Sequence, residues 1–180
     1  MKLFTIILLS LFMVSCENVL NEEIIYKISK GNHYPDNFIK YTGSVGHKMV
    51  FTIELDSSCY YTRAEPASNK AYGFSANYMN PKKYSCRITW GCDDKGQLYL
   101  GYLVHINGST DSHYCIPAQV GKKYLCSIDD QVNNFFIIID SNYYVVKKDI
   151  YYERKVRELP YFGGYKPAPH DVYIIVKELN

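Results

Sequence analysis

Alternating apolar and polar residues, the period-two pattern of a half-buried β-strand, recur along most of this chain. The clearest examples are residues 49–55, 84–90 and 98–106, where apolar side chains occupy every second position. Residues 135–139 and 172–176 are short continuous apolar runs, which are typical of strands covered on both faces. We therefore predict strands over these segments.

Turn signals separate the predicted strands. The strongest is Asp-Asp-Lys-Gly at residues 93–96, because glycine can take the positive φ that a tight hairpin requires. The best helix candidate is Asp149 to Leu159, but its charged, β-branched and aromatic residues fit an edge strand plus a loop equally well. About ten to twelve short strands predict an all-β fold, a single antiparallel β-sandwich or jelly roll with little helix.

The N-terminus carries a different pattern. After Lys2, residues 3–14 are almost wholly apolar, and Ser15 and Cys16 follow. A helix of that length crosses only about 18 Å, well short of a bilayer core of about 30 Å, so the run predicts a signal peptide rather than a membrane span. The stretch LFMVSC resembles the lipobox of bacterial lipoproteins. That resemblance implies cleavage before Cys16 and lipidation of its sulfur with acyl chains such as palmitate.

These features divide the chain into residues 1–15 as a lipoprotein signal peptide, residues 16–23 as the lipidated cysteine with a polar tether, and residues 24–180 as one β-sandwich domain. The expected location is the cell envelope, where the lipid on Cys16 anchors the protein to the outer membrane. The domain would face either the periplasm or the outside. The alternative is a plainly secreted protein in which Cys16 is incidental.

Composition narrows the function classes. The formal net charge is +2, and acidic residues interrupt the basic cluster at residues 147–157. Nucleic-acid binding needs uncompensated positive charge, so no nucleic-acid partner is expected. The 19 tyrosines fit two interpretations, because tyrosine favours half-buried strands and its ring also stacks on sugars.

Besides Cys16, the cysteines are Cys59, Cys86, Cys92, Cys115 and Cys126. Their odd number leaves at least one unpaired. An extended strand would place Cys86 and Cys92 about 20 Å apart, too far for a disulfide. We expect most of these residues to be buried free thiols, and no cysteine or histidine spacing indicates zinc.

Several short sequence motifs, here called phrases, are distinctive: Lys30 to Tyr34, Leu55 to Tyr60, Tyr72 to Ser75, Arg87 to Trp90, Pro160 to Gly164, and Ala168 to Asp171. Together they resemble a group of small proteins from Bacteroides-type bacteria, many of which are lipoproteins. The phrases YFGG and APHD, followed by an apolar strand, also resemble the end of some concanavalin-A-like jelly rolls. The resemblance implies that fold and an envelope location, and it carries no activity.

The alternations place five side chains opposite the apolar faces of their strands: Glu54, Arg87, Thr89, Tyr99 and His105. If the three strands are neighbours in one sheet, these side chains form a polar, aromatic patch. Sugars are bound by such mixtures, with flat rings against their C–H faces and fixed donors and acceptors for their hydroxyls. We predict that the patch binds a glycan or another surface ligand. The alternative is an ordinary solvated outer face.

An elimination reaction on an acidic glycan is the second hypothesis. Arg87 would neutralise the uronate carboxylate, and His105 or Tyr99 would act as base and acid. Hydrolysis needs two carboxylates about 5–10 Å apart, and Glu54 has no obvious partner. The motifs of alginate-lyase-like jelly rolls and laminarinase-like glycosidases are missing, so a non-catalytic binding module is preferred over a lyase. A structural or adhesive envelope protein without a small ligand is the third hypothesis.

A few other residues have both a functional and a structural interpretation. Trp90 is expected in the core rather than as a stacking platform. His33 would bind a ligand or cap its turn, and His170-Asp171 is expected to fasten residues 163–167 to the sheet rather than bind a metal. The aspartate pairs at 93–94 and 129–130 leave calcium as an alternative, but no cofactor is expected.

Overall fold

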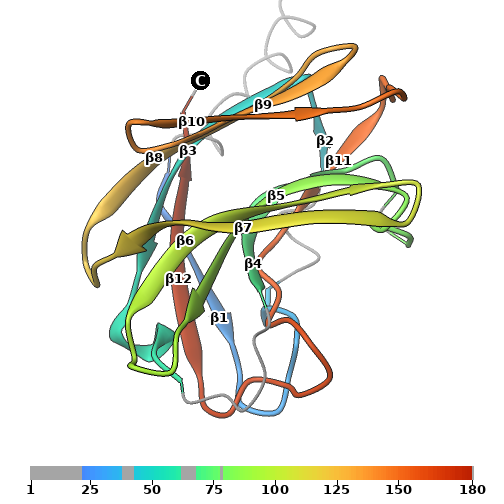
Figure 1. Cartoon of the computed structure of the whole chain (residues 1–180). Coiled ribbons are helices and arrows are strands. Elements are labelled where there is room, and N and C mark those ends of the chain that lie inside the picture. Colours follow the sequence, from blue (N-terminus) through green and yellow to red (C-terminus); the bar gives the residue numbers. More distant parts are fainter. Residues whose placement is uncertain (1–21, 38–42, 62–67, 78, 180) are drawn as a thin grey trace, which may run out of the picture.

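The computed structural model describes residues 22–37, 43–61, 68–77 and 79–179, and this part of the chain is all-β (Figure 1). Two six-stranded antiparallel sheets form a sandwich around one hydrophobic core, as predicted. Within these residues the one helical turn is the 3-10 helix η2 (Ser57–Cys59). None of the described helical segments has the length and apolarity to cross a bilayer. The predicted signal peptide and Cys16 lie outside the described residues.

The first sheet has the order β1-β12-β3-β8-β9-β10. Its strands are β1 (Ile24–Ile28), β12 (Val172–Glu178), β3 (Lys48–Leu55), β8 (Lys123–Asp130), β9 (Asn134–Ile139) and β10 (Asn142–Lys147). The first and last strands pair antiparallel, with Ile24 opposite Val176. The start of the domain therefore lies beside its C-terminal strand.

The second sheet has the order β2-β11-β4-β5-β6-β7. Its strands are β2 (Ser44–Val45), β11 (Lys155–Glu158), β4 (Asn69–Ser75), β5 (Tyr84–Cys92), β6 (Leu98–Ile106) and β7 (Ser109–Ala118). The predicted hairpin at residues 93–96 joins β5 to β6, and Gly96 takes a φ of +78° there. β11 comes from the stretch Asp149 to Leu159, so the candidate helix there is wrong and the alternative of a strand plus a loop holds. The strand is not at the edge of the sheet, however, because β11 pairs with β2 on one side and β4 on the other.

The core is built from the apolar faces that the alternation predicted. Phe51 of β3 and Cys86, Ile88 and Trp90 of β5 are completely buried. Trp90 packs edge-on against Phe162, with 5.8 Å between ring centroids. Its expected place in the core is therefore confirmed.

The five cysteines within the described residues are all free thiols, as expected for most of them. Cys59, Cys86 and Cys126 are buried, whereas Cys92 and Cys115 are partly exposed. Burial raises the pKa of the thiol at each of the three buried positions, so these groups stay protonated and act as small apolar side chains.

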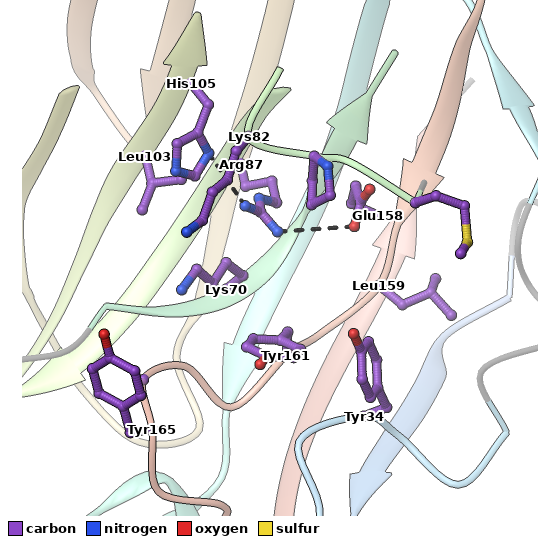
Figure 2. A pocket seen from close by; sticks show the side chains of 13 residues that line it. Tyr34, Lys70, Lys82, Arg87, Leu103, His105, Glu158, Leu159, Tyr161 and Tyr165 are labelled. Atoms are coloured by element: carbon purple, nitrogen blue, oxygen red, sulfur yellow. Dashed lines mark hydrogen bonds and ion pairs between the residues drawn. The ribbon is translucent and has the colours of Figure 1, made fainter. Parts of the chain in front are cut away.

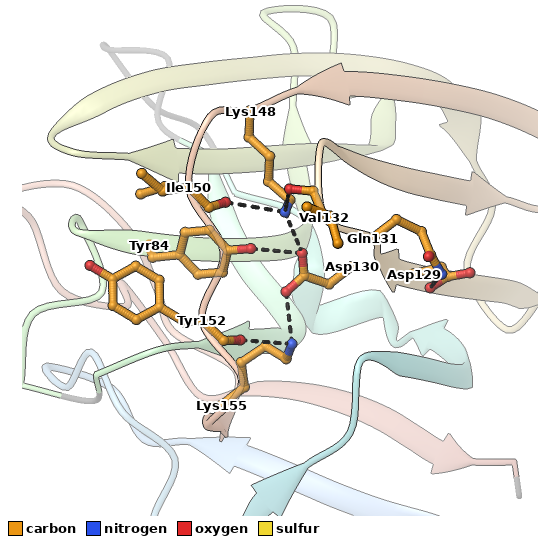
Figure 3. Close-up of polar contacts among 9 residues, drawn as sticks. All are labelled: Tyr84, Asp129, Asp130, Gln131, Val132, Lys148, Ile150, Tyr152 and Lys155. Atoms are coloured by element: carbon orange, nitrogen blue, oxygen red, sulfur yellow. Dashed lines mark hydrogen bonds and ion pairs between the residues drawn. The ribbon is translucent and has the colours of Figure 1, made fainter.

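A buried charge cluster fastens the connection between the two sheets, which runs from β10 to β11 (Figure 3). The carboxylate of Asp130 lies 3.0 Å from the Nζ of Lys148 and 2.8 Å from the Nζ of Lys155. The Tyr84 hydroxyl donates to the same carboxylate at 2.7 Å. Both lysine side chains are fully buried, and each also donates to backbone carbonyls of the connection. The cluster therefore holds β11 in place.

One aspartate of each pair considered for calcium has other partners in this structure. Both oxygens of Asp130 are occupied by ammonium groups, and Asp93 accepts the backbone N–H groups of Lys95 at 2.9 Å and Gln97 at 2.8 Å. Within the described part of the chain, no group of three or more histidine, cysteine, aspartate or glutamate side chains is arranged to hold a metal ion. The contacts of Asp93 and Asp130 stabilise a turn and the buried charge cluster, respectively.

Candidate functional site

The outer face of the second sheet carries a cleft of about 400 Å³. Four residues on adjacent strands are in register along its floor. Glu158 of β11 pairs with Gly73 of β4, and Gly73 pairs with Arg87 of β5. Arg87 in turn pairs with Leu103 of β6. These residues form one row across four strands. Because Gly73 has no side chain, Arg87 can extend over it, and its Nη1 lies 3.8 Å from Oε2 of Glu158.

The neighbouring row continues the polar floor. Ser75 donates to Glu158, and Oγ of Ser85 lies 3.1 Å from Nδ1 of His105. The guanidinium of Arg87 lies between Glu158 and His105, with Nη2 3.5 Å from the same Nδ1 (Figure 2). Since a guanidinium only donates, Nδ1 accepts and the imidazole proton belongs on Nε2. The result is a chain of polar contacts along the floor.

The cleft is cationic. Lys70 and Lys82 join Arg87 in lining it, and Glu158 is the one carboxylate among the described residues that do so. Burial, reinforced by the charges of Arg87 and both lysines, lowers the pKa of His105 from 6.5 to about 4. His105 is therefore neutral at pH 7. Burial also raises the pKa of Glu158, although Arg87 opposes that shift.

Tyrosines form the wall of the cleft opposite this floor. Tyr161 lies in the loop between β11 and β12, and its backbone exchanges two hydrogen bonds with Lys70, at 2.8 and 2.9 Å. Tyr34 packs edge-on against Tyr161, with 4.9 Å between centroids, and Tyr165 is fully exposed beside them (Figure 2). Burial raises the pKa of the Tyr161 phenol, so this group stays protonated at neutral pH.

His33 supports that wall. Its ring stacks on Tyr161 at 5.3 Å between centroids, and its Nδ1 lies 2.7 Å from the carbonyl oxygen of Phe162. His33 is not among the residues that line the cleft. In this structure the His33 ring therefore contacts Tyr161 and the Phe162 carbonyl, a supporting role that neither sequence-based interpretation named.

His170 and Asp171 also have structural roles. The Nε2 of His170 lies 2.7 Å from the carbonyl oxygen of Ser58, and Asp171 accepts the backbone N–H of Lys30 at 2.8 Å. These contacts tie the chain before β12 to η2 and to the turn after β1. A fastening role for His170 and Asp171 was predicted. The segments that they fasten are η2 and the turn after β1, however, and not residues 163–167.

The structure brings together only part of the predicted patch. Arg87 and His105 line the cleft. Thr89 and Tyr99 lie on the same face farther along β5 and β6, as their register shows. Thr89 is only 1% exposed, and its hydroxyl has no partner within the described part of the chain. Glu54 is a correction: β3 belongs to the first sheet, so the three strands are not neighbours and Glu54 lies elsewhere.

Sequence reasoning missed the remaining polar residues that line the cleft, which are Tyr34, Lys70, Lys82, Glu158, Tyr161 and Tyr165. Tyr161 belongs to the YFGG phrase on which the family resemblance rested, so that phrase contained a usable signal. Glu158 lies in the stretch with no clear helix or strand period. The others sit in loops or at strand ends, where periodicity carries no information.

Comparisons with known proteins support the fold. A scan against protein-family models and a search of curated sequences find no match. The alginate lyase from Alteromonas sp. 272 has a TM-score of 0.57 at 8% identity, covering 87% of this chain and 86% of that chain. The alginate lyase AlyC3 has a TM-score of 0.57 at 11% identity, covering 88% and 74%.

A third similar structure is the GH16 protein of the Bacteroides ovatus mixed linkage glucan PUL, in complex with its G4G4G3G product. Its TM-score is 0.53 at 14% identity, covering 88% of this chain and 81% of that chain. At such low identities the likeness concerns architecture. The protein has the concanavalin-A-like jelly-roll fold that these polysaccharide-processing proteins share.

Proposed function

We propose that the protein binds an acidic polysaccharide, with uronate carboxylates held in the cleft around Arg87. The observation that carries this proposal is the presence of Lys70, Lys82 and Arg87, opposed by Glu158, in one cleft walled by tyrosines. Ammonium and guanidinium groups form charge-assisted hydrogen bonds with carboxylates, and tyrosine rings pack against the C–H faces of sugars. The relatives named for alginate and glucan support a polysaccharide as the ligand class.

Binding without turnover fits the floor of the cleft best. The charge of Arg87 is already balanced in part by Glu158 at 3.8 Å, which weakens its ability to stabilise a second negative charge. Hydrolysis requires two carboxylates about 5–10 Å apart. Glu158 has no second carboxylate beside it among the described lining residues.

A polysaccharide lyase is the second candidate, and the ionisation states of two residues favour it. The pKa of His105 is lowered to about 4, so its imidazole is available as a base at neutral pH. Tyr161 retains its proton and would serve as the acid. It takes the place of Tyr99, which does not line the cleft. Ultraviolet absorbance of an unsaturated uronate product during incubation with acidic polysaccharides tests this candidate.

Calorimetric titration tests binding. Residues 22–180 contain all twelve strands, so they are suitable as a soluble domain. We expect affinity for polyuronate oligosaccharides that falls as salt rises, and none for neutral glucans. Lys82→Gln should weaken binding, whereas Lys147→Gln, on the other sheet, should not. Equal affinity for neutral and acidic glycans, or binding that is insensitive to Lys82→Gln, would overturn the proposal.

We also propose that the domain is anchored to the outer membrane of the cell envelope through lipid on Cys16. Support comes from the lipobox-like sequence before that residue. The tether of residues 16–23 spans at most about 28 Å when extended, so the sandwich would stay close to the membrane surface. Mass spectrometry of the membrane-extracted protein should find the leader removed and acyl chains on Cys16. Cys16→Ser should release the protein into the soluble fraction, and an intact leader would contradict the anchor.

A further inference from the structure

Tyr114 of β7 lies across two glycines on the same face of the second sheet as the cleft. It is opposite Gly101 of β6, which lies opposite Thr89 of β5. A side chain on Gly91 of β5 would come within 2.9 Å of Cζ of Tyr114 and still closer to its hydroxyl. A side chain on Gly101 would come within 3.0 Å of Cα of Tyr114. The Tyr114 ring therefore lies against the backbone at Gly91, and the absence of a side chain at Gly101 leaves room for the backbone of β7 at Tyr114.

A second ring extends this aromatic surface. Tyr99 of β6 lies beside Tyr114, with 5.8 Å between centroids and 33° between planes. The Tyr99 hydroxyl donates to Asp93 at 3.4 Å, which restrains the ring. Tyr114 itself is 42% exposed and lies on β7, the edge strand of the second sheet. A ring supported by backbone on one side and open to solvent on the other is the geometry on which a sugar ring stacks.

The aromatic surface and the cleft belong to one continuous face. Tyr114 is two strands away from Arg87 and one two-residue step along β6, which places the two Cα atoms roughly 12 Å apart. Thr89 lies between Arg87 and Gly91 on β5, and its hydroxyl has no partner within the described residues. A single monosaccharide would not reach both positions, whereas an oligosaccharide would.

We infer that Tyr114, supported by Gly91 and Gly101 and flanked by Tyr99, is a second subsite that stacks on a sugar ring of the same glycan chain that the cleft holds. This inference rests on the proposed function. It defines the ligand further: the cleft binds a carboxylate-bearing residue, and Tyr114 binds the apolar face of a residue farther along the chain. The protein would then recognise oligosaccharides rather than single sugars.

Titration of wild-type and variant residues 22–180 with uronate dimers and hexamers tests the subsite. We expect Tyr114→Ala to weaken hexamer binding about five- to tenfold, the effect of one lost aromatic contact, and to leave dimer binding in the cleft unchanged. Tyr114→Phe should bind as the wild type does. Tyr143→Ala, which removes an exposed tyrosine from the first sheet, is the matched control.

The outcomes separate this inference from the proposed function. If wild-type protein binds neither dimer nor hexamer, the proposed function is wrong, and the inferred subsite is wrong as well. If it binds the hexamer and Tyr114→Ala does so equally well, the subsite fails and the proposed function stands. Tyr114→Leu keeps an apolar side chain over Gly91 but removes the aromatic ring. It should show the same loss for the hexamer, which keeps the test decisive if Tyr114→Ala does not fold.

Discussion

Arg87 and Glu158 form an ion pair across Gly73, with 3.8 Å between Nη1 and Oε2 and with both side chains almost completely buried. The two residues come from β5 and β11, which are separated by β4. Burial makes a charged group costly unless it has a partner, so each side chain stabilises the ionised form of the other. Glu158 also reduces the attraction of the cleft for anions, because its charge opposes that of Arg87 and the two lysines.

Removal of that carboxylate charge should strengthen the binding of acidic glycans. Glu158→Gln removes the one carboxylate among the described lining residues, so we expect several-fold tighter binding of a uronate hexamer at low salt. Calorimetric titration measures the effect. Glu54→Gln on the first sheet removes the same charge away from the cleft and should leave the affinity unchanged. Weaker binding by Glu158→Gln would show that the carboxylate contacts the ligand favourably.

Gly73 is required by the packing of the cleft floor. A side chain there would lie 2.7 Å from Cα of Arg87 and would overlap the carbonyl oxygen of Cys86. Gly73→Ala should therefore lower the free energy of unfolding by about 1–3 kcal/mol, the cost of overpacking. Urea denaturation measures it. Gly46→Ala is the control, because nothing lies within 4 Å of a Cβ at that position. Equal stabilities of the two variants would contradict this account of the floor.

Asp130 balances two buried lysines, so its removal should be severe. Asp130→Ala leaves Lys148 and Lys155 charged and fully buried without their carboxylate. We expect a loss of about 3–5 kcal/mol in the free energy of unfolding. Thermal and urea denaturation provide the measurement. Asp129→Ala, at the adjacent position, removes a carboxylate that accepts a hydrogen bond from the exposed Gln131 side chain and should cost far less. A mild effect at Asp130 would mean that the lysines find other partners.

His105 should make the protein less stable in acid. Its pKa is about 4 in the folded protein against an ordinary 6.5. Between those values the unfolded chain takes up a proton that the folded protein does not, so the free energy of unfolding falls as pH drops from 7 to 4. His105→Gln lacks this group and should lose less stability over that range. Denaturation at a series of pH values measures the difference.

The control for that pH series is His113→Gln, which changes a histidine whose side chain is 63% exposed. This variant should follow the wild-type pH dependence more closely than His105→Gln does. NMR titration of the His105 ring provides a second readout. A midpoint near 6.5 would contradict the burial effect.

Periodicity predicted which side chains of a strand face the core and which face outward, and the structure confirms this in β5. Ile88 and Trp90 lie in the core, and Arg87 lies on the outer face, because successive side chains in a strand point to opposite sides. The same pattern could not place Glu54. Its strand has the period of β5 and β6, but it belongs to the other sheet.

Alternation is a local property, so the all-β fold, the hairpin at residues 93–96 and the side of its strand on which each residue lies follow from the sequence alone. The contact of Glu158 with Arg87 across Gly73 and the place of Tyr161 in the cleft wall arise from the way the strands are arranged in space. Backbone hydrogen bonds are alike in every strand, so they do not select a neighbour. That choice depends on how all the apolar faces pack together in one core, which local patterns do not record.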